Sequence, residues 1–173
     1  MFAEGAKKRG ILYNDSNSKV RIVSMDKINI LLVDDNEVIR IFFKDIFWLH
    51  GLGNQFHLEI ASGVDEALAI VRDPEKKIDV VFLDLVMPLK KDGKEITTSE
   101  AGLSVLRTIK SDATMKHIKV IVFSGYTDKK DIEEAKKSGA DMYLAKEEHL
   151  PQDLIRIFDG LAKKDGSLYQ FSK

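Results

Sequence analysis

The sequence contains no cysteine, has almost no net charge and has no apolar run longer than a strand. Without cysteine the chain can form neither a disulfide framework nor a thiolate metal site, which fits a reducing, cytoplasmic setting. Its 27 lysines and arginines nearly balance 28 aspartates and glutamates, so no long-range field draws it to nucleic acid or to a membrane surface. The short apolar runs and the polar N-terminus predict neither a membrane-spanning helix nor a secretory signal.

A chain of 173 residues is long enough for one well-packed α/β domain but too short for two of ordinary size. Residues 1–26 show no sustained period, and we expect them to form a flexible or loosely docked arm. We expect the domain to occupy residues 27–163 and a C-terminal tail to occupy residues 164–173.

From Ile28 onward, short apolar segments alternate with segments of helical period, the pattern of a parallel sheet with helices on both faces. The expected strands are 28–35, 57–61, 78–88, 118–124 and 141–146. The expected helices are 36–50, 63–73, 100–110, 129–139 and 151–164.

Residues that favour helix ends support these bounds. Ser62 is expected to cap the second helix, and either Thr127 or Asp128 the fourth. Gly51 and Gly139 follow the first and fourth helices, where a left-handed residue is expected.

Polar side chains end four of the five expected strands. Asp34 and Asp35 end the first strand, Asp84 lies in the third, Ser124 ends the fourth and Lys146 ends the fifth. Because ligands of open parallel sheets bind beyond the carboxyl ends of the strands, we expect these side chains to meet at one edge.

Three carboxylates in one place need compensation, since two charges about 4 Å apart repel by roughly 4 kcal/mol at an effective dielectric constant near 20. Proton uptake is one remedy, and a hard divalent cation with oxygen ligands is the other. Mg²⁺ suits two carboxylates and leaves room for phosphate oxygens. Together with the ammonium of Lys146 and the hydroxyl of Ser124, the acids predict a phosphoryl-transfer site with Asp84 as nucleophile.

Taken singly, each of these residues has a simpler interpretation. Asp34 could cap the first helix and Asp84 a helix or turn, Ser124 could form a turn, and Lys146 could be a solvated surface lysine. Only their combination, in this order along the chain, favours a site.

Four motifs, "VDDN", "FLDLVMP", "VFSG" and "YLAK", resemble those of response-regulator receiver domains of two-component signalling, often called CheY-like. The resemblance covers roughly residues 27–163 and implies a doubly wound five-stranded parallel sheet of order 2-1-3-4-5 with five helices. It also implies that Asp84 is the phosphoacceptor. Asp35 and Asp84 would bind Mg²⁺ directly, with the backbone carbonyl of Val86 as a third ligand and Asp34 acting through water.

The resemblance assigns further roles to three residues. Ser124 would be the switch hydroxyl that follows the phosphoryl group, Lys146 its ion-pair partner and Tyr143 the aromatic residue that turns inward. A histidine kinase or a histidine phosphotransfer protein would be the donor. The surface of the fourth helix, fifth strand and fifth helix would then recruit or release another protein.

The sequence departs from the family in two places. Glu147 follows Lys146 where the family has a proline in a cis peptide; a cis bond there would cost about 3 kcal/mol, so we expect a trans bond and a different loop. Residues 89–101 form an insertion whose "KKDGK" core predicts a tight turn. Val86 and Tyr126 are expected to impede the attacking water and slow dephosphorylation.

The first helix has more large apolar residues than one buried stripe requires. Four of them can face the sheet, namely Ile39, Phe42, Phe43 and Ile46. Ile41 and Trp48 are then left for a second face, which favours a homodimer or a docked N-terminal arm; simple coverage by the arm or the last helix is the alternative.

The favoured function is therefore a phosphorylation switch that acts on a separate protein and is not an enzyme in its own right. The alternative is a receiver-fold interaction module that is not switched. An aspartate-nucleophile phosphatase would need a second acid two residues after Asp84, where this chain has Val86.

Overall fold

The computed structural model describes residues 11–14, 20–23, 27–91, 93–125, 128–148 and 151–162, with only the backbone for 11–14, 20–23 and 91. The central strands are β3 (Ile28–Val33), β4 (Phe56–Ala61), β5 (Val80–Leu83), β8 (Lys119–Ser124) and β9 (Met142–Ala145). The helices are α1 (Glu37–Leu49), α2 (Val64–Arg72), α3 (Ser99–Ser111), α4 (Lys129–Lys137) and α5 (Pro151–Ala162), with a 3-10 turn, η1 (Leu52–Asn54). Two hairpins complete the chain: β1 (Ile11–Asn14) with β2 (Val20–Val23), and β6 (Met87–Lys91) with β7 (Lys94–Thr98).

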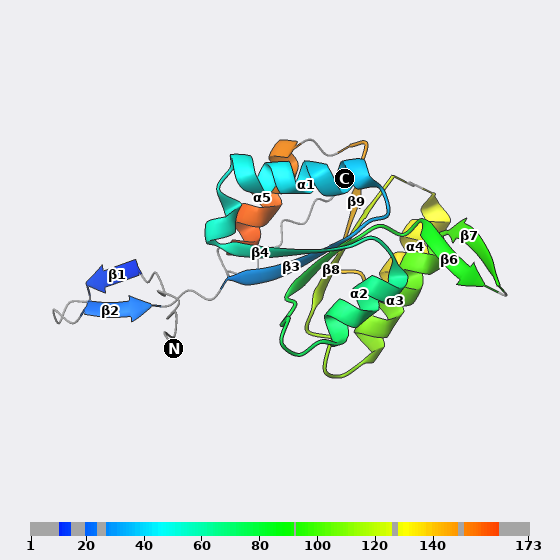
Figure 1. The fold of residues 1–173 in the computed structure, drawn as a ribbon, viewed down its shortest axis with the longest axis horizontal. Coiled ribbons are helices and arrows are strands. Elements are labelled where there is room, and N and C mark those ends of the chain that lie inside the picture. The colour runs from blue at the N-terminus through cyan, green and yellow to red at the C-terminus, as the bar shows by residue number, and fades with distance from the viewer. Residues whose placement is uncertain are drawn as a thin grey trace, which may run out of the picture.

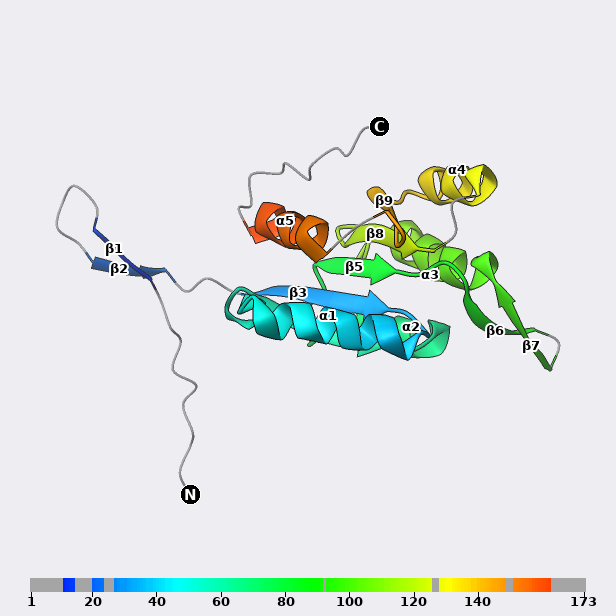
Figure 2. The same ribbon diagram turned by 90° about the horizontal axis from the view of Figure 1, so that it is seen from above.

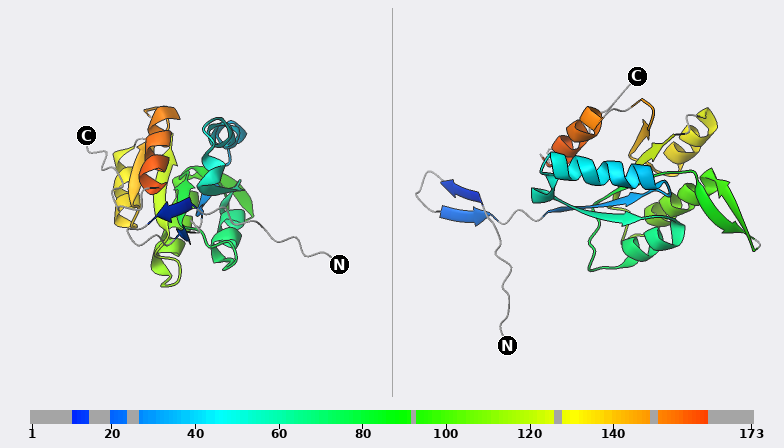
Figure 3. Two further views of the ribbon diagram at one scale, coloured as in Figure 1. Left: turned by 90° about the vertical axis from the view of Figure 1, so that its left-hand side faces the viewer. Right: turned by 45° about the horizontal axis from the view of Figure 1, so that its top comes forward.

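The five central strands are parallel and lie in the order β4-β3-β5-β8-β9. Counted along the sheet's own strands, this is the predicted order 2-1-3-4-5, and the predicted α/β class with five helices is confirmed. Figure 1 and Figure 3 show α1 and α5 on one side of the sheet, and α2 and α3 on the other. Within the described residues, no helix is both long enough and apolar enough to cross a membrane.

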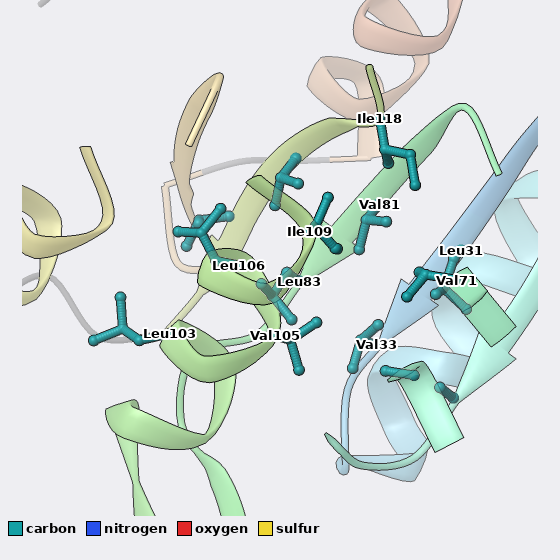
Figure 4. Packing of buried hydrophobic residues seen from close by; sticks show 14 of the residues in the cluster. Leu31, Val33, Val71, Val81, Leu83, Leu103, Val105, Leu106, Ile109 and Ile118 are labelled. Carbon is teal, nitrogen blue, oxygen red and sulfur yellow. The ribbon is translucent and has the colours of Figure 1, made fainter. Parts of the chain in front are cut away.

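The core consists of two layers because the strands are apolar on both faces. Along β3, Leu31 and Val33 pack with α2 and α3 (Figure 4), whereas Ile30 and Leu32 pack with α1 and α5. All four side chains are fully buried, as expected where successive residues point to opposite covered faces.

Aromatic contacts fix α1 and α5 on their side of the sheet. The ring of Phe43 meets Phe82, Phe123 and Phe158 edge to face, with centroids 5.3, 5.6 and 6.3 Å away. Phe43 is therefore the centre of the inward face predicted for α1, and its contacts hold the middle of α1 against the sheet.

One predicted helix cap is wrong and two glycine caps are confirmed. Ser62 does not cap α2, because Gly63 is the N-cap and the N–H and hydroxyl of Ser62 donate instead to the carboxylate of Glu66. Gly51 and Gly139 have left-handed backbones, with φ of 62° and 93°. Of the two candidates for α4, Asp128 caps the helix, while Thr127 lies outside the described residues.

The third strand is shorter than predicted, and both hairpins were missed. The chain leaves the sheet after Leu83, so that Met87 and Pro88 belong to the β6–β7 hairpin formed by the insertion. Its "KKDGK" segment turns as predicted, with Gly93 at a φ of 72°. The N-terminal segment contains the β1–β2 hairpin, while the remainder of residues 1–26 and the tail at 164–173 fall outside the described part. The flexible or loosely docked arm and the tail therefore remain predictions.

Candidate functional site

Backbone hydrogen bonds align the strand ends that carry the predicted site residues. The N–H of Asp84 donates to the carbonyl of Val33 at 2.9 Å, which places the end of β5 beside the end of β3. The N–H of Lys146 donates to the carbonyl of Ser124 at 2.9 Å and joins the end of β9 to the end of β8. The parallel register therefore brings all four strand ends to one edge.

An acidic cluster forms at that edge, as predicted. Carboxylate oxygens of Asp34, Asp35 and Asp84 lie within 4.8 Å of one another. Asp34 and Asp84 are buried, whereas Asp35 is exposed. An open cleft of about 430 Å³ lies over the cluster and is lined by Asp35, Asn36, Ile39, Asp84, Val86, Gly125 and Lys146. The cluster can therefore be reached from solvent.

Lys146 pairs with two of the acids at once. Its Nζ lies 2.5 Å from Asp84 Oδ2 and 2.7 Å from Asp34 Oδ2. Burial alone would lower the pKa of the Lys146 ammonium, but the charge of Asp84 and the contacts with both carboxylates outweigh burial and raise the pKa above 10.5. Lys146 is therefore charged at neutral pH and offsets part of the repulsion within the cluster.

Asp34 keeps one oxygen without a full hydrogen-bond partner. Its Oδ1 accepts from the N–H of Asn36 at 3.0 Å, but its buried Oδ2 has only the ion-pair contact with Lys146 and, among the described residues, no donor in hydrogen-bond geometry. Burial raises the pKa of Asp34 above 3.8 despite the opposing effect of Lys146. Asn36 caps α1, so Asp34 is not the helix cap that its position alone allowed.

Both oxygens of Asp84 are held by donors. Oδ1 accepts from the buried hydroxyl of Ser124 at 2.8 Å and from the N–H of Val86 at 3.2 Å, and Oδ2 accepts from Lys146. The side chains of Ser124 and Lys146 therefore both bind the carboxylate of Asp84, and the neighbouring strands fix its orientation.

Tyr143 is half-buried on β9 and interacts with Ser124. Burial raises the pKa of its hydroxyl, the carboxylates of Asp131 and Asp84 add to this effect, and a hydrogen bond with Ser124 opposes it. Tyr143 is thus near the predicted switch hydroxyl, while its switching role stays a prediction.

The described residues include no cis peptide bond, so Lys146–Glu147 is trans as expected. Tyr126 lies outside the described residues.

Comparison with known proteins identifies the family. Residues 30–158 match the response regulator receiver domain. The chain belongs to this family. One relative is the polar-differentiation response regulator DivK of Brucella ovis, 27% identical over 129 residues that cover 75% of this chain and 92% of DivK.

Solved receiver structures share its fold. The cyanobacterial phytochrome response regulator RcpA is 25% identical with a TM-score of 0.62, and the match covers 79% of this chain and 91% of RcpA. The receiver domain of the sensor histidine kinase PA1611 from Pseudomonas aeruginosa is 20% identical with a TM-score of 0.61, and the match covers 80% of this chain and 99% of that one.

Two residues of this receiver domain that shape the site were not predicted. Nη1 of the half-buried Arg40 donates to the carbonyls of Asp34 and Asp35 at 2.8 and 2.6 Å, and so ties the acid pair to α1. The N–H of Gly102 donates to the carbonyl of Leu85 at 2.9 Å, which brings α3 against the segment that follows Asp84. The sequence did contain a hint for Gly102, because a glycine inside a helical pattern often has a packing role. It contained none for Arg40, because a single arginine is common in amphipathic helices.

Proposed function

We propose that this receiver domain is a phosphorylation switch: Asp84 accepts a phosphoryl group from a histidine kinase or a histidine phosphotransfer protein in a Mg²⁺-dependent reaction. The observation that carries the proposal is the convergence of Lys146 and Ser124 on the two oxygens of one carboxylate beside an open acidic cleft. The solved structure of RcpA is of its phosphorylated form, which supports this chemistry in a relative of the same fold.

The donor set fits a magnesium ion. The three clustered carboxylates offer hard oxygen ligands, which Mg²⁺ prefers, and Oδ2 of Asp34 has only its ion-pair contact with Lys146. Asp35, Asp84 and the carbonyl of Val86 would hold the ion, with Asp34 acting through water. When bound, it would supply positive charge that neutralises phosphate oxygens. The PA1611 receiver domain was solved with a magnesium ion coordinated in its active-site cleft.

The chemistry is an in-line transfer in which the chain mainly positions groups. A carboxylate oxygen of Asp84 forms a bond to phosphorus, the bond between phosphorus and the donor's imidazole nitrogen breaks, and that nitrogen takes up a proton. Lys146 stays as counter-ion to the new phosphoryl group. Ser124 would exchange its hydrogen bond with Asp84 for one with a phosphoryl oxygen.

That exchange supplies the switch. Ser124 is fully buried and interacts with the half-buried Tyr143, so movement of the hydroxyl changes the packing around Tyr143 on β9. We propose that the change reaches the neighbouring surface of α4, β9 and α5 and alters its affinity for a separate protein.

The proposal is tested by incubating the full chain with acetyl phosphate and Mg²⁺ and measuring intact mass. We expect one phosphoryl group per chain, and none when a chelator removes Mg²⁺ or when Asp84→Asn removes the acceptor. Asp159→Asn, which removes an exposed acid from α5, is the matched control and should be phosphorylated normally. A folded wild-type chain that takes up nothing would instead indicate the unswitched interaction module.

Arg40→Met is expected to weaken Mg²⁺ binding roughly tenfold, the usual scale for groups that orient metal ligands. The substitution keeps the side-chain stem but removes both hydrogen bonds to the carbonyls of Asp34 and Asp35. Loss of a cation by itself would favour Mg²⁺, so weaker binding reports the lost positioning. Isothermal titration with MgCl₂ measures the affinity.

Lys44→Met is the control for this experiment, because Lys44 is an exposed cation on the same helix. It should leave Mg²⁺ affinity unchanged or slightly raise it. Equal affinities for Arg40→Met and Lys44→Met would show that Arg40 does not position the acid pair.

A further inference from the structure

The outward face of α1 is unusually apolar. Among the described residues, five large hydrophobic side chains are exposed, and four of them lie on this helix: Val38 (71%), Ile41 (49%), Trp48 (80%) and Leu49 (67%). Their spacing of 3, 10 and 11 residues from Val38 places all four on one side of a helix with 3.6 residues per turn. We call them the α1 patch. Exposed large apolar side chains gathered on one face of a helix mark a contact surface, here with the exposed Asp45 between the two pairs.

The β1–β2 hairpin is a second element that lacks cover. Its strands pair only with each other and belong to no larger sheet of the described structure. Their sequences, "ILYN" and "VRIV", are mostly apolar. Because an isolated two-stranded hairpin is at best marginally stable in water, these strands need a surface to pack against.

The hairpin joins the domain beside the end of the α1 patch. Only residues 24–27 separate Val23 from Ile28, a reach of about 17 Å when extended. The N–H of Ile28 donates to the carbonyl of Gln55, just after η1, and η1 begins directly after the end of α1. Figure 2 shows the hairpin beyond the end of the sheet at which α1 finishes. Trp48, in the last turn of α1, is therefore within reach.

The β1–β2 hairpin and the α1 patch are also similar in length, and residues beside them carry charges of opposite sign. Strands of four residues span about 13 Å, and the ten residues from Val38 to Trp48 rise about 15 Å along the helix. Residues 1–27 contain six lysines and arginines but three acids. On α1, the exposed Glu37 lies next to the first patch residue, and the exposed Asp45 lies between Ile41 and Trp48. The arm is therefore net basic, and Asp45, which lies among the patch residues, offers it a partner of opposite charge.

We propose that the β1–β2 hairpin folds back onto the α1 patch and covers Trp48 and Leu49. A short tether gives the hairpin an effective concentration of about millimolar, which exceeds that of a second chain at ordinary concentrations. The patch begins at Val38, two residues after Asn36, which lines the acidic cleft. Trp48 and Leu49 lie at the opposite end of α1, so an arm docked on them leaves the acidic cleft open.

Trp48 is the only tryptophan in the chain and reports the proposed contact directly. We expect the fluorescence of the full-length wild type to be that of a shielded indole, with low quenching by acrylamide that does not change with protein concentration. In the full-length double variant Leu12→Asp/Ile22→Asp the emission should shift to longer wavelength and the quenching constant should rise severalfold. Asn17→Asp/Ser18→Asp adds the same charge to the same arm at polar residues and should behave as wild type.

Three results would overturn the proposal. Equally strong quenching in wild type and Leu12→Asp/Ile22→Asp would mean that Trp48 is never covered. Shielding that disappears on dilution, with a matching change in sedimentation, would assign the patch to a second copy. Shielding retained in the double variant would assign it to another part of the chain. Nuclear Overhauser contacts between the Trp48 indole and the methyl groups of residues 11–23 provide an independent measurement, and their absence in the folded wild type would also exclude docking.

Discussion

Replacing Lys146 with methionine is expected to lower the free energy of unfolding by about 3–5 kcal/mol in metal-free buffer. Methionine keeps most of the stem but removes the ammonium, which lies 2.5 Å from Asp84 and 2.7 Å from Asp34. Both carboxylates are buried, so the variant has to hold two neighbouring negative charges without their counter-ion. Urea denaturation followed by circular dichroism measures the loss.

The loss of unfolding free energy in Lys146→Met should become larger as the pH rises. The pKa of Asp34 is already raised above 3.8 by burial, and removal of Lys146 raises it further. A carboxyl group whose pKa is higher in the folded state favours folding most below 3.8 and loses this contribution as the pH rises through the folded pKa. The deficit of the variant should therefore grow from about pH 4 toward neutral pH. In the wild type, the raised pKa of Lys146 keeps its contribution intact until the pH exceeds 10.5.

Lys119→Met is the matched control, because Lys119 is a half-exposed lysine whose partner Asp141 also pairs with Lys110. Its loss should cost less than about 1 kcal/mol. Added Mg²⁺ should stabilise Lys119→Met as much as it stabilises the wild type, and should stabilise Lys146→Met more, because the carboxylates that lost their counter-ion bind the cation more tightly. If the two variants were equally stable at pH 7, the ion pairs of Lys146 would not stabilise the fold.

The sheet and its acidic edge could be predicted because both depend on short-range patterns. Continuous apolar strands such as Ile28–Val33 require cover on both faces, and parallel strands place their carboxyl ends together. Asp34, Asp84 and Lys146 therefore had to converge, and the register aligns them. The exposed second face of α1 followed in the same way from counting apolar positions on one helix.

Features that depend on which atoms a side chain reaches, or on the close approach of two segments, escaped prediction. The cap at Ser62 failed because α2 begins one residue later than such a cap requires, with Gly63 as N-cap, and Ser62 donates to the carboxylate of Glu66 instead. The role of Arg40 depends on its guanidinium reaching back to two carbonyls across the first turn of α1. Gly102 offered only the signal of a glycine inside a helical pattern, and its role depends on the closeness of α3 to the chain after Asp84, which that signal does not reveal.

Gly102→Ala is expected to impair the acceptor site strongly. A Cβ at this position would lie 2.3 Å from the carbonyl oxygen of Asp84 and 2.4 Å from the Cα of Leu85, and both are backbone atoms that no rotamer change can move. Alanine favours a helix by about 1 kcal/mol over glycine, but the overpacking costs about 1–3 kcal/mol or more. Relief requires α3 or the acceptor segment to move. Because displacement of a reacting group by about 1 Å can cost roughly a hundredfold in rate, we expect phosphorylation of Asp84 by acetyl phosphate to slow on that scale.

The matched control is Gly53→Ala in η1, where a Cβ would meet no atom within 4 Å. It should preserve both the unfolding free energy and the phosphorylation rate, so any loss specific to Gly102→Ala reports the contact between α3 and the acceptor segment. Rate and stability are measured separately, by intact mass over time and by urea denaturation, because a folded variant that is slow would locate the effect at Asp84. A Gly102→Ala chain as stable and as rapidly phosphorylated as Gly53→Ala would show that the close packing against Asp84 and Leu85 is not required.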